Sequence, residues 1–241
     1  RLAWPSREYA IVLEDDLEVS PAYARWVLGA WRHYEHRDDV AGASLQRQTL
    51  KPALPMGRVE IINEHKPFLY RLISTWGFAP HPARWREFTE WWPRARRAGV
   101  EPIVPHLVTS QWYRRVKKGS MWSAWFIYFC EQRGLFNLHV NVGGKRALAA
   151  NWQEPGEHFG AGKYSSQRES EPYGAWSPQL DVWPASPVRY DWDATPLRPS
   201  VAAALDALRA DVYPPLFAAL GVVGNLWGAG GGGAPPPPPP R

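Results

Sequence analysis

The chain has little cysteine: a single residue, Cys130, rules out any disulfide within it and leaves its redox compartment open. No apolar run is long enough to span a bilayer and no secretory signal is present, although a chain that begins at Arg1 gives the second absence little weight. A Ser-His-Asp arrangement, a Cys-x-x-Cys pair and a phosphate-cradling glycine loop are also missing from the sequence.

Charge of either sign is moderate. The residues are 45% hydrophobic and 21% charged, enough apolar material for one large domain, or one domain with a tail. A net charge of +5 would permit nucleic-acid binding. However, no nucleic-acid module accompanies the basic groups, which lie on helix-like segments at 94–97 and 114–118. We therefore expect solvated helix faces and no nucleic-acid partner.

Tryptophan, in contrast, is abundant, with 15 residues. Several recur at helical spacing and are expected in the core. Trp76 differs because it precedes Gly77 in a predicted loop. Aromatic faces stack on sugar rings, so Trp76 is a candidate for ligand binding as well as for core packing.

The most informative segment is the apolar run 9–13, which is followed at once by Glu14, Asp15 and Asp16. Such a run predicts a strand buried on both faces, and ligands of open α/β sheets bind at the carboxyl ends of strands. Three adjacent carboxylates repel one another unless a cation shares the charge, and oxygen ligands suit Mg²⁺ or Mn²⁺. The alternative is a solvated acidic turn. Ser20-Pro21 predicts the start of a helix with an apolar stripe to Tyr34.

The rest of the pattern alternates strands and helices, which predicts α/β architecture. We expect strands over 40–45, 59–62, 69–73 and 136–142, and helices over 82–98, 104–117, 121–132 and 201–212. Gly134 is the expected stop of the third of these helices. From 151 to about 199 the sequence is rich in Pro, Gly, Ser and Trp and has little periodicity.

The segment Val12–Pro21 resembles the metal-binding DXD segment of GT-A glycosyltransferases, and most closely the Glu-Asp-Asp form of the N-acetylglucosaminyltransferase I-like group. The segments 42–47, 75–77 and 122–127 are similar to those of predicted plant and algal members of this family. The resemblance implies a glycosyltransferase that takes a nucleotide-sugar donor and a glycan or glycoconjugate acceptor. It also implies Mn²⁺ (or Mg²⁺) as cofactor, and residence in the Golgi or endomembrane lumen.

In that family the nucleotide-binding half, roughly 100 residues of βαβ units, precedes the acidic motif. Only thirteen residues precede Glu14 here, so we expect an N-terminally truncated domain. The expected fold is the C-terminal portion of a GT-A (nucleotide-diphospho-sugar transferase) domain over 1–150, with a mixed sheet flanked by helices. An irregular extension over 151–227 with one short helix and a disordered, low-complexity Gly/Pro tail over 228–241 are expected to follow.

The resemblance assigns roles to individual residues. It implies that Asp16 binds the metal, that Glu14 and Asp15 lie against the donor, and that His158 is a possible second metal ligand. Arg47, just after the second predicted strand, is a candidate for donor phosphate, and Trp76 with Gly77 for the acceptor.

An inverting transferase also needs a general base. No carboxylate lies between Glu101 and Glu131, and His106 stands where the family has an acid. The catalytic candidates are therefore His106 and Glu101, with Glu87 and Glu90 as alternatives. A catalytically inactive, carbohydrate- or partner-binding homologue remains the second hypothesis, and metal-dependent phosphoryl transfer the third.

Overall fold

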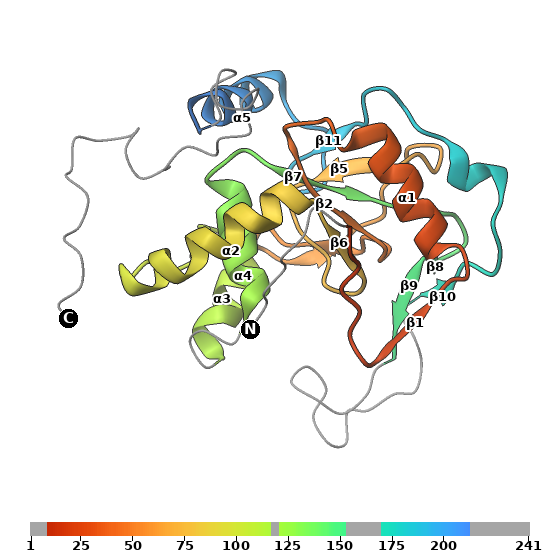
Figure 1. Cartoon of the computed structure of the whole chain (residues 1–241), viewed down its shortest axis with the longest axis horizontal. Coiled ribbons are helices and arrows are strands. Elements are labelled where there is room, and N and C mark those ends of the chain that lie inside the picture. Colours follow the sequence, from red (N-terminus) through yellow and green to blue (C-terminus); the bar gives the residue numbers. More distant parts are fainter. Residues whose placement is uncertain (1–8, 117–120, 153–169, 213–241) are drawn as a thin grey trace.

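A computed structural model describes residues 9–116, 121–152 and 170–212 of the chain (Figure 1). Its centre is a mixed five-stranded sheet in the order β11-β5-β7-β2-β6. The strands are β2 (Val40–Ser44), β5 (Phe68–Tyr70), β6 (Phe78–Pro80), β7 (Phe136–His139) and β11 (Arg189–Tyr190). β2 pairs parallel with β7 and antiparallel with β6, and the added strand β11 pairs parallel with β5. The α/β class expected from the sequence is confirmed.

Helices cover both faces of this sheet. Helix α1 (Tyr23–Tyr34) packs on one face, and α2 (Pro82–Arg97), α3 (Val108–Arg115) and α4 (Trp122–Glu131) pack on the other (Figure 1). The expected tryptophan stripes are buried as predicted, with Trp26 and Trp31 on α1 and Trp85 and Trp91 on α2. Burial of such large side chains, each worth about 1.5–3 kcal/mol, provides most of the driving force for this packing.

Strand β7 alternates between the two cores. Phe136 and Leu138 belong to the α1 side, whereas the His139 ring stacks on Phe68 of the α2–α4 side. Apolar and polar residues therefore alternate along the strand, but the polar residues Asn137 and His139 are as buried as the apolar ones. The reason is that β7 is a central strand with helices on both faces.

Short strands complete the fold beside the main sheet. β1 (Leu17–Val19) pairs antiparallel with β9 (Ala149–Asn151), and β8 (Arg146–Ala147) pairs parallel with β10 (Glu171–Pro172). β3 (Leu50–Lys51) and β4 (Gly57–Arg58) form a hairpin. A 3₁₀ turn, η1 (Pro178–Asp181), and helix α5 (Pro199–Val212) follow. None of the helices in the described parts of the chain has the length and apolarity that a bilayer crossing requires.

Several expected boundaries differ from those observed. Residues 9–13 form a single bridge at Val12 rather than a strand, and 59–62 form no strand. Helix α1 begins at Tyr23 without a side-chain cap, because Ser20 lies in the preceding turn, where its Oγ accepts from the Ala22 amide at 3.1 Å. Helix α3 begins at Val108 rather than 104, and Gly134 ends α4 with φ of 60° as predicted.

Candidate functional site

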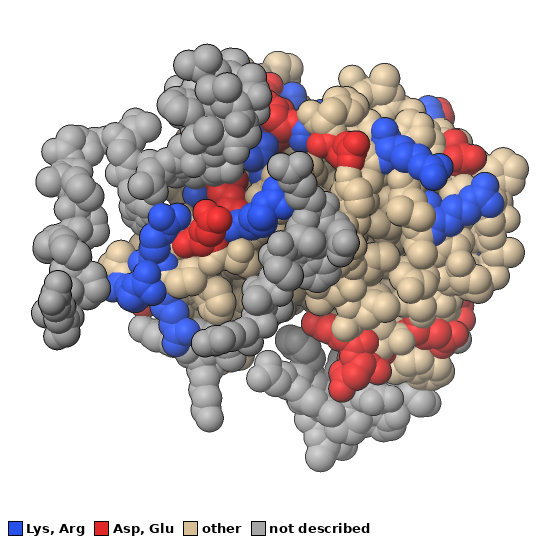
Figure 2. All heavy atoms as spheres, viewed as in Figure 1, with Lys and Arg blue, Asp and Glu red and all other residues tan. Residues whose placement is uncertain are grey.

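The acidic turn lies at the edge of the main sheet. Val12 and Phe78 exchange backbone hydrogen bonds of 2.8 and 3.0 Å, so residue 12 continues the sheet beyond β6. The chain then leaves the sheet: Leu13 is 42% exposed, Asp15 and Asp16 form a turn, and Leu17 begins β1. The segment is not buried on both faces because β6 borders it on one side, and no described strand borders it on the other. Figure 2 shows acidic side chains gathered over this turn.

Asp16 is joined to Asn151 across the β1–β9 pair. The Asn151 amide nitrogen donates to Asp16 Oδ2 at 3.4 Å and to the Trp152 carbonyl at 3.2 Å. The Trp152 backbone N–H donates to the Asp16 carbonyl at 2.9 Å. Asn151 is only 3% exposed. The side chain of Asp16 is thus held by a buried partner rather than by solvent.

Each member of this pair keeps one oxygen without a partner. Among the residues that the structure describes, neither Asp16 Oδ1 nor Asn151 Oδ1 has a hydrogen-bond partner, and both atoms are buried. Leaving such an oxygen unsatisfied costs about 1–3 kcal/mol. A carboxylate oxygen and an amide oxygen are the donor atoms that Mg²⁺ and Mn²⁺ prefer. The donor set therefore fits a hard divalent cation.

Glu14 lies on the surface beside this pair, and its pKa is raised. Partial removal of water around the carboxyl is the larger cause, and the charges of Asp16 and Asp15 add to it. The part of this rise in pKa that comes from Asp16 and Asp15 reflects the crowding of negative charge at the turn, which a bound cation relieves.

A cavity of about 440 Å³ is lined in part by the loop before β6, through Ser74, Thr75 and Trp76. Two aromatic side chains, Trp76 and Trp112, and the charged residue Arg58 belong to its wall. The remaining lining is uncharged. It is formed by Gln46, Gln48, Thr49, Leu50, Met56, Gly57, Leu72, Ile73, Ser74, Thr75, Thr109, Met121, Ser123 and Ile127. This combination of aromatic surface with neutral donors and acceptors suits a hydroxyl-rich ligand.

Gly77 lies in the chain between Trp76, which lines the cavity, and Phe78, which pairs with Val12 just before the acidic turn. Its φ of +79° and its surroundings both require glycine, since a Cβ there would lie 2.9 Å from the Cβ of Ala149 and 3.0 Å from that of Leu45. The Gly77 carbonyl accepts from the Leu45 amide at 2.9 Å. Gly77 thus contacts β9 two residues before Asn151, and the adjacent Trp76 lines the cavity. The two halves of the candidate site are neighbours through this loop.

The predicted catalytic residues lie elsewhere. His106 is an exposed turn residue with φ of 63°, and its carbonyl accepts from the Leu54 amide. Glu101 is exposed on the loop before it. Neither lines the cavity, and no described residue of the lining is Asp, Glu or His.

The alternative glutamates also lie away from the cavity lining. Glu90 is exposed on α2, whereas Glu87 is 4% exposed, and Arg133 Nε lies 2.7 Å from its Oε1. Glu90 is therefore a charge on the exposed face of its helix, whereas Glu87 is held in a buried ion pair.

The structure brings together only part of the predicted site. Arg47 pairs with Glu60 at 2.8 Å and is not part of the cavity lining, although its neighbours Gln46 and Gln48 are. His158 lies outside the described residues. No group of three or more His, Cys, Asp or Glu side chains in the described ranges is arranged for a metal. The sequence analysis missed Asn151, although a polar residue ending the apolar run 147–150 is the same signal that singled out Asp16.

Comparison with known proteins identifies no relative: no protein-family model matches the chain, and no curated protein matches it.

Proposed function

We propose that the chain carries the metal and acceptor regions of a glycosyltransferase that transfers a sugar from a nucleotide-sugar donor to an acceptor hydroxyl. The observation that supports this best is the Asp16–Asn151 pair with its two buried, unsatisfied oxygens. The strand that carries Asn151 packs against Gly77, and the residue before Gly77, Trp76, lines the cavity. The family resemblance of the same segments supports the proposal independently.

Asp16 would hold Mn²⁺ or Mg²⁺, and Glu14 and Asp15 would lie toward the donor. When bound, the ion supplies Lewis acidity that stabilises the charge on the departing nucleoside diphosphate. The protein's own contribution is positional. The Asn151 amide fixes the Asp16 carboxylate, and the Trp76 ring offers a face to the sugar while neutral side chains such as Gln46 and Thr109 offer hydrogen bonds.

A second candidate function is carbohydrate binding without transfer. It is favoured by one observation, the lack of any carboxylate or histidine in the described lining of the cavity, which leaves no base beside an acceptor placed there.

The test is hydrolysis and transfer with a panel of nucleotide sugars, with and without Mn²⁺, on the whole chain. The transferase proposal predicts Mn²⁺-dependent turnover that Asp16→Asn removes and that the distant exposed control Asp181→Asn retains. Carbohydrate binding alone predicts quenching of tryptophan fluorescence by glycans, lost in Trp76→Ala, with no turnover. If neither turnover nor glycan binding is found, both functions are excluded.

A further inference from the structure

We propose that Asn151 is a second protein ligand of the divalent ion, through its side-chain carbonyl oxygen. The inference rests on the proposed function, because it concerns the same ion, and it adds a residue that the acidic motif does not contain. Asn151 lies in β9, some 135 residues after Asp16 in the chain, and reaches it through the antiparallel register that pairs Leu17 with Asn151.

The orientation of the Asn151 amide is fixed by its neighbours. Both groups within hydrogen-bond distance of Nδ2, the Asp16 carboxylate and the Trp152 carbonyl, are acceptors. The nitrogen must therefore face them, and the carbonyl oxygen is the atom of the amide that is left without a partner in the described parts of the chain. That oxygen belongs to a side chain that is 97% buried, and it finds no donor among the described residues. Burial of an oriented acceptor without a donor is costly, and a cation offsets the cost.

The neutrality of asparagine matters at this position. The turn already carries the three adjacent carboxylates of Glu14, Asp15 and Asp16. A fourth carboxylate would increase the repulsion in the metal-free protein. An amide oxygen adds a ligand dipole without adding charge, so the site remains compatible with folding before the ion binds. Two hard oxygen donors select Mn²⁺, Mg²⁺ or Ca²⁺ over Zn²⁺.

Two substitutions of Asn151 distinguish a metal ligand from a purely structural residue, because a ligand role predicts opposite effects of the two on Mn²⁺ binding. Asn151→Ala removes the oxygen. Asn151→Asp keeps an oxygen and adds a charge, but it replaces the hydrogen bond to Asp16 by repulsion. A structural role predicts that both variants weaken the site. A ligand role predicts that Asn151→Asp is destabilised without metal and regains stability as Mn²⁺ is added.

The experiment measures Mn²⁺ alone, by the loss of the free-ion electron paramagnetic resonance signal, and thermal unfolding with and without Mn²⁺. We expect Asn151→Ala to weaken Mn²⁺ binding at least 10- to 100-fold, Asn151→Asp to bind at least as tightly as the native chain, and the control Asn141→Ala to be unchanged. Asn141 is a matched control because its amide also bridges two acceptors, the Ile61 carbonyl and Asn63.

Two outcomes overturn the inference: native Mn²⁺ affinity in Asn151→Ala, or loss of affinity in a folded Asn151→Asp. If Asn151→Ala fails to fold, the Asn151→Asp result decides alone. Failure of the proposed function is distinguishable, because it would leave Mn²⁺ binding dependent on residue 151 while no nucleotide sugar is turned over. If the native chain takes up no Mn²⁺, the inference falls as well.

Discussion

His139 is the most deeply buried ionisable side chain next to the cavity wall. It is fully buried, and its Nε2 lies 2.9 Å from the carbonyl of Leu72, a residue of the cavity lining. Because a carbonyl only accepts, Nε2 carries the proton and the neutral ring is the form that the fold holds. Burial lowers the pKa of His139 to about 4, an effect only partly opposed by the bond to Leu72.

This pKa makes stability depend on pH in a defined direction. The ordinary histidine pKa is 6.5, so between pH 6.5 and 4 the unfolded chain takes up a proton that the folded chain does not. The contribution of His139 is present above pH 6.5 and is lost as the pH falls toward 4, by about 3 kcal/mol in total.

We expect His139→Phe, which keeps a ring against Phe68, to lower stability at pH 7. The variant should also abolish this part of the acid-dependent loss. Urea unfolding at several pH values measures it, and exposed His36→Gln should retain the native slope. Equal slopes in native and His139→Phe chains would contradict the assignment.

Gly77 offers a second prediction for a single residue, with an internal control. Gly77→Ala incurs left-handed strain of about 1 kcal/mol and also places a Cβ 2.9–3.0 Å from Ala149 and Leu45. Gly99 has nearly the same φ, +75°, with no atom within 4 Å of its missing Cβ. We expect Gly99→Ala to cost about 1 kcal/mol and Gly77→Ala about 2–4 kcal/mol by denaturant unfolding. Equal losses would show that packing at residue 77 is looser than described.

Among the elements, α2 and the end of α4 are joined by the buried pair of Glu87 and Arg133. Both side chains are 4% exposed, and the Arg133 guanidinium also lies 3.9 Å over the Phe129 ring. Removing one member leaves the other charged in the core. We expect Glu87→Ala to destabilise the protein by about 3–5 kcal/mol and exposed Glu90→Ala by less than about 0.5 kcal/mol.

The double variant Glu87→Leu with Arg133→Met tests the reason. Because it removes both charges and keeps apolar volume, it should recover most of the stability lost in Glu87→Ala. Thermal unfolding compares the variants. A double variant that is as unstable as the sum of two single losses would mean that the cation–ring and packing contacts of Arg133 outweigh the charge term.

Helices whose apolar residues recur at regular spacing could be predicted from the sequence. Short strands that exist only because they pair with a distant strand could not. The stripe of Trp85, Phe88 and Trp91 specifies α2 to within one residue, because helical hydrogen bonds are local. The run at 9–13 has the composition of a buried strand, yet it lies at a sheet edge and pairs only at Val12. Strand β11 has two residues and no periodic signal, so only the Phe68–Tyr70 partner defines it.

The residues of the candidate site also differ in how far they could be predicted from the sequence. Asp16 and Trp76 were recognised because each stands in an unusual local sequence. Asn151 also ends an apolar run, but its place beside Asp16 depends on a long-range register that the local sequence does not show. The buried ion pair of Glu87 depends in the same way on a partner, Arg133, that lies 46 residues away in the chain. A residue in an unusual local sequence can be recognised from that sequence. A contact between residues that are far apart in the chain depends on how the strands and helices pack, and the local sequence does not predict it.

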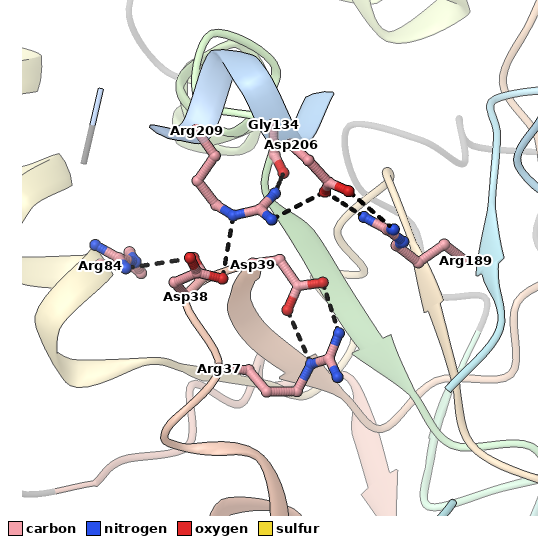
Figure 3. A network of polar contacts seen from close by, with 8 residues as sticks. All are labelled: Arg37, Asp38, Asp39, Arg84, Gly134, Arg189, Asp206 and Arg209. Carbon is pink, nitrogen blue, oxygen red and sulfur yellow. Dashed lines mark hydrogen bonds and ion pairs between the residues drawn. The ribbon is translucent and has the colours of Figure 1, made fainter. Parts of the chain in front are cut away.

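At the scale of the whole molecule, α5 is tied to the sheet by a network of charges (Figure 3). Arg209 donates to the Gly134 carbonyl at 3.2 Å and to Asp206 at 2.9 Å, and it forms an ion pair with Asp38 at 3.1 Å. Arg189 of β11 binds the same Asp206 at 2.6 Å. The hydrogen bond from Arg189, followed by that from Arg209, holds the pKa of Asp206 below its ordinary value. Leu205 adds a buried apolar contact on the α1 side.

The last prediction follows from this arrangement. Only Leu205 and Arg209 are buried among the residues of α5 whose exposure is described, so Arg209→Ala removes the main polar attachment of the helix. Because Asp38 and Asp206 are 64% and 42% exposed, solvent compensates them in part, and we expect a modest global loss of about 1–2 kcal/mol. The local effect is larger: amides of 200–212 should exchange hydrogen at least tenfold faster, while those of the central sheet are unchanged. Mass-spectrometric hydrogen exchange measures both, with exposed Arg32→Ala as control. Unchanged exchange in α5 would mean that Leu205 and the backbone contacts suffice to hold the helix.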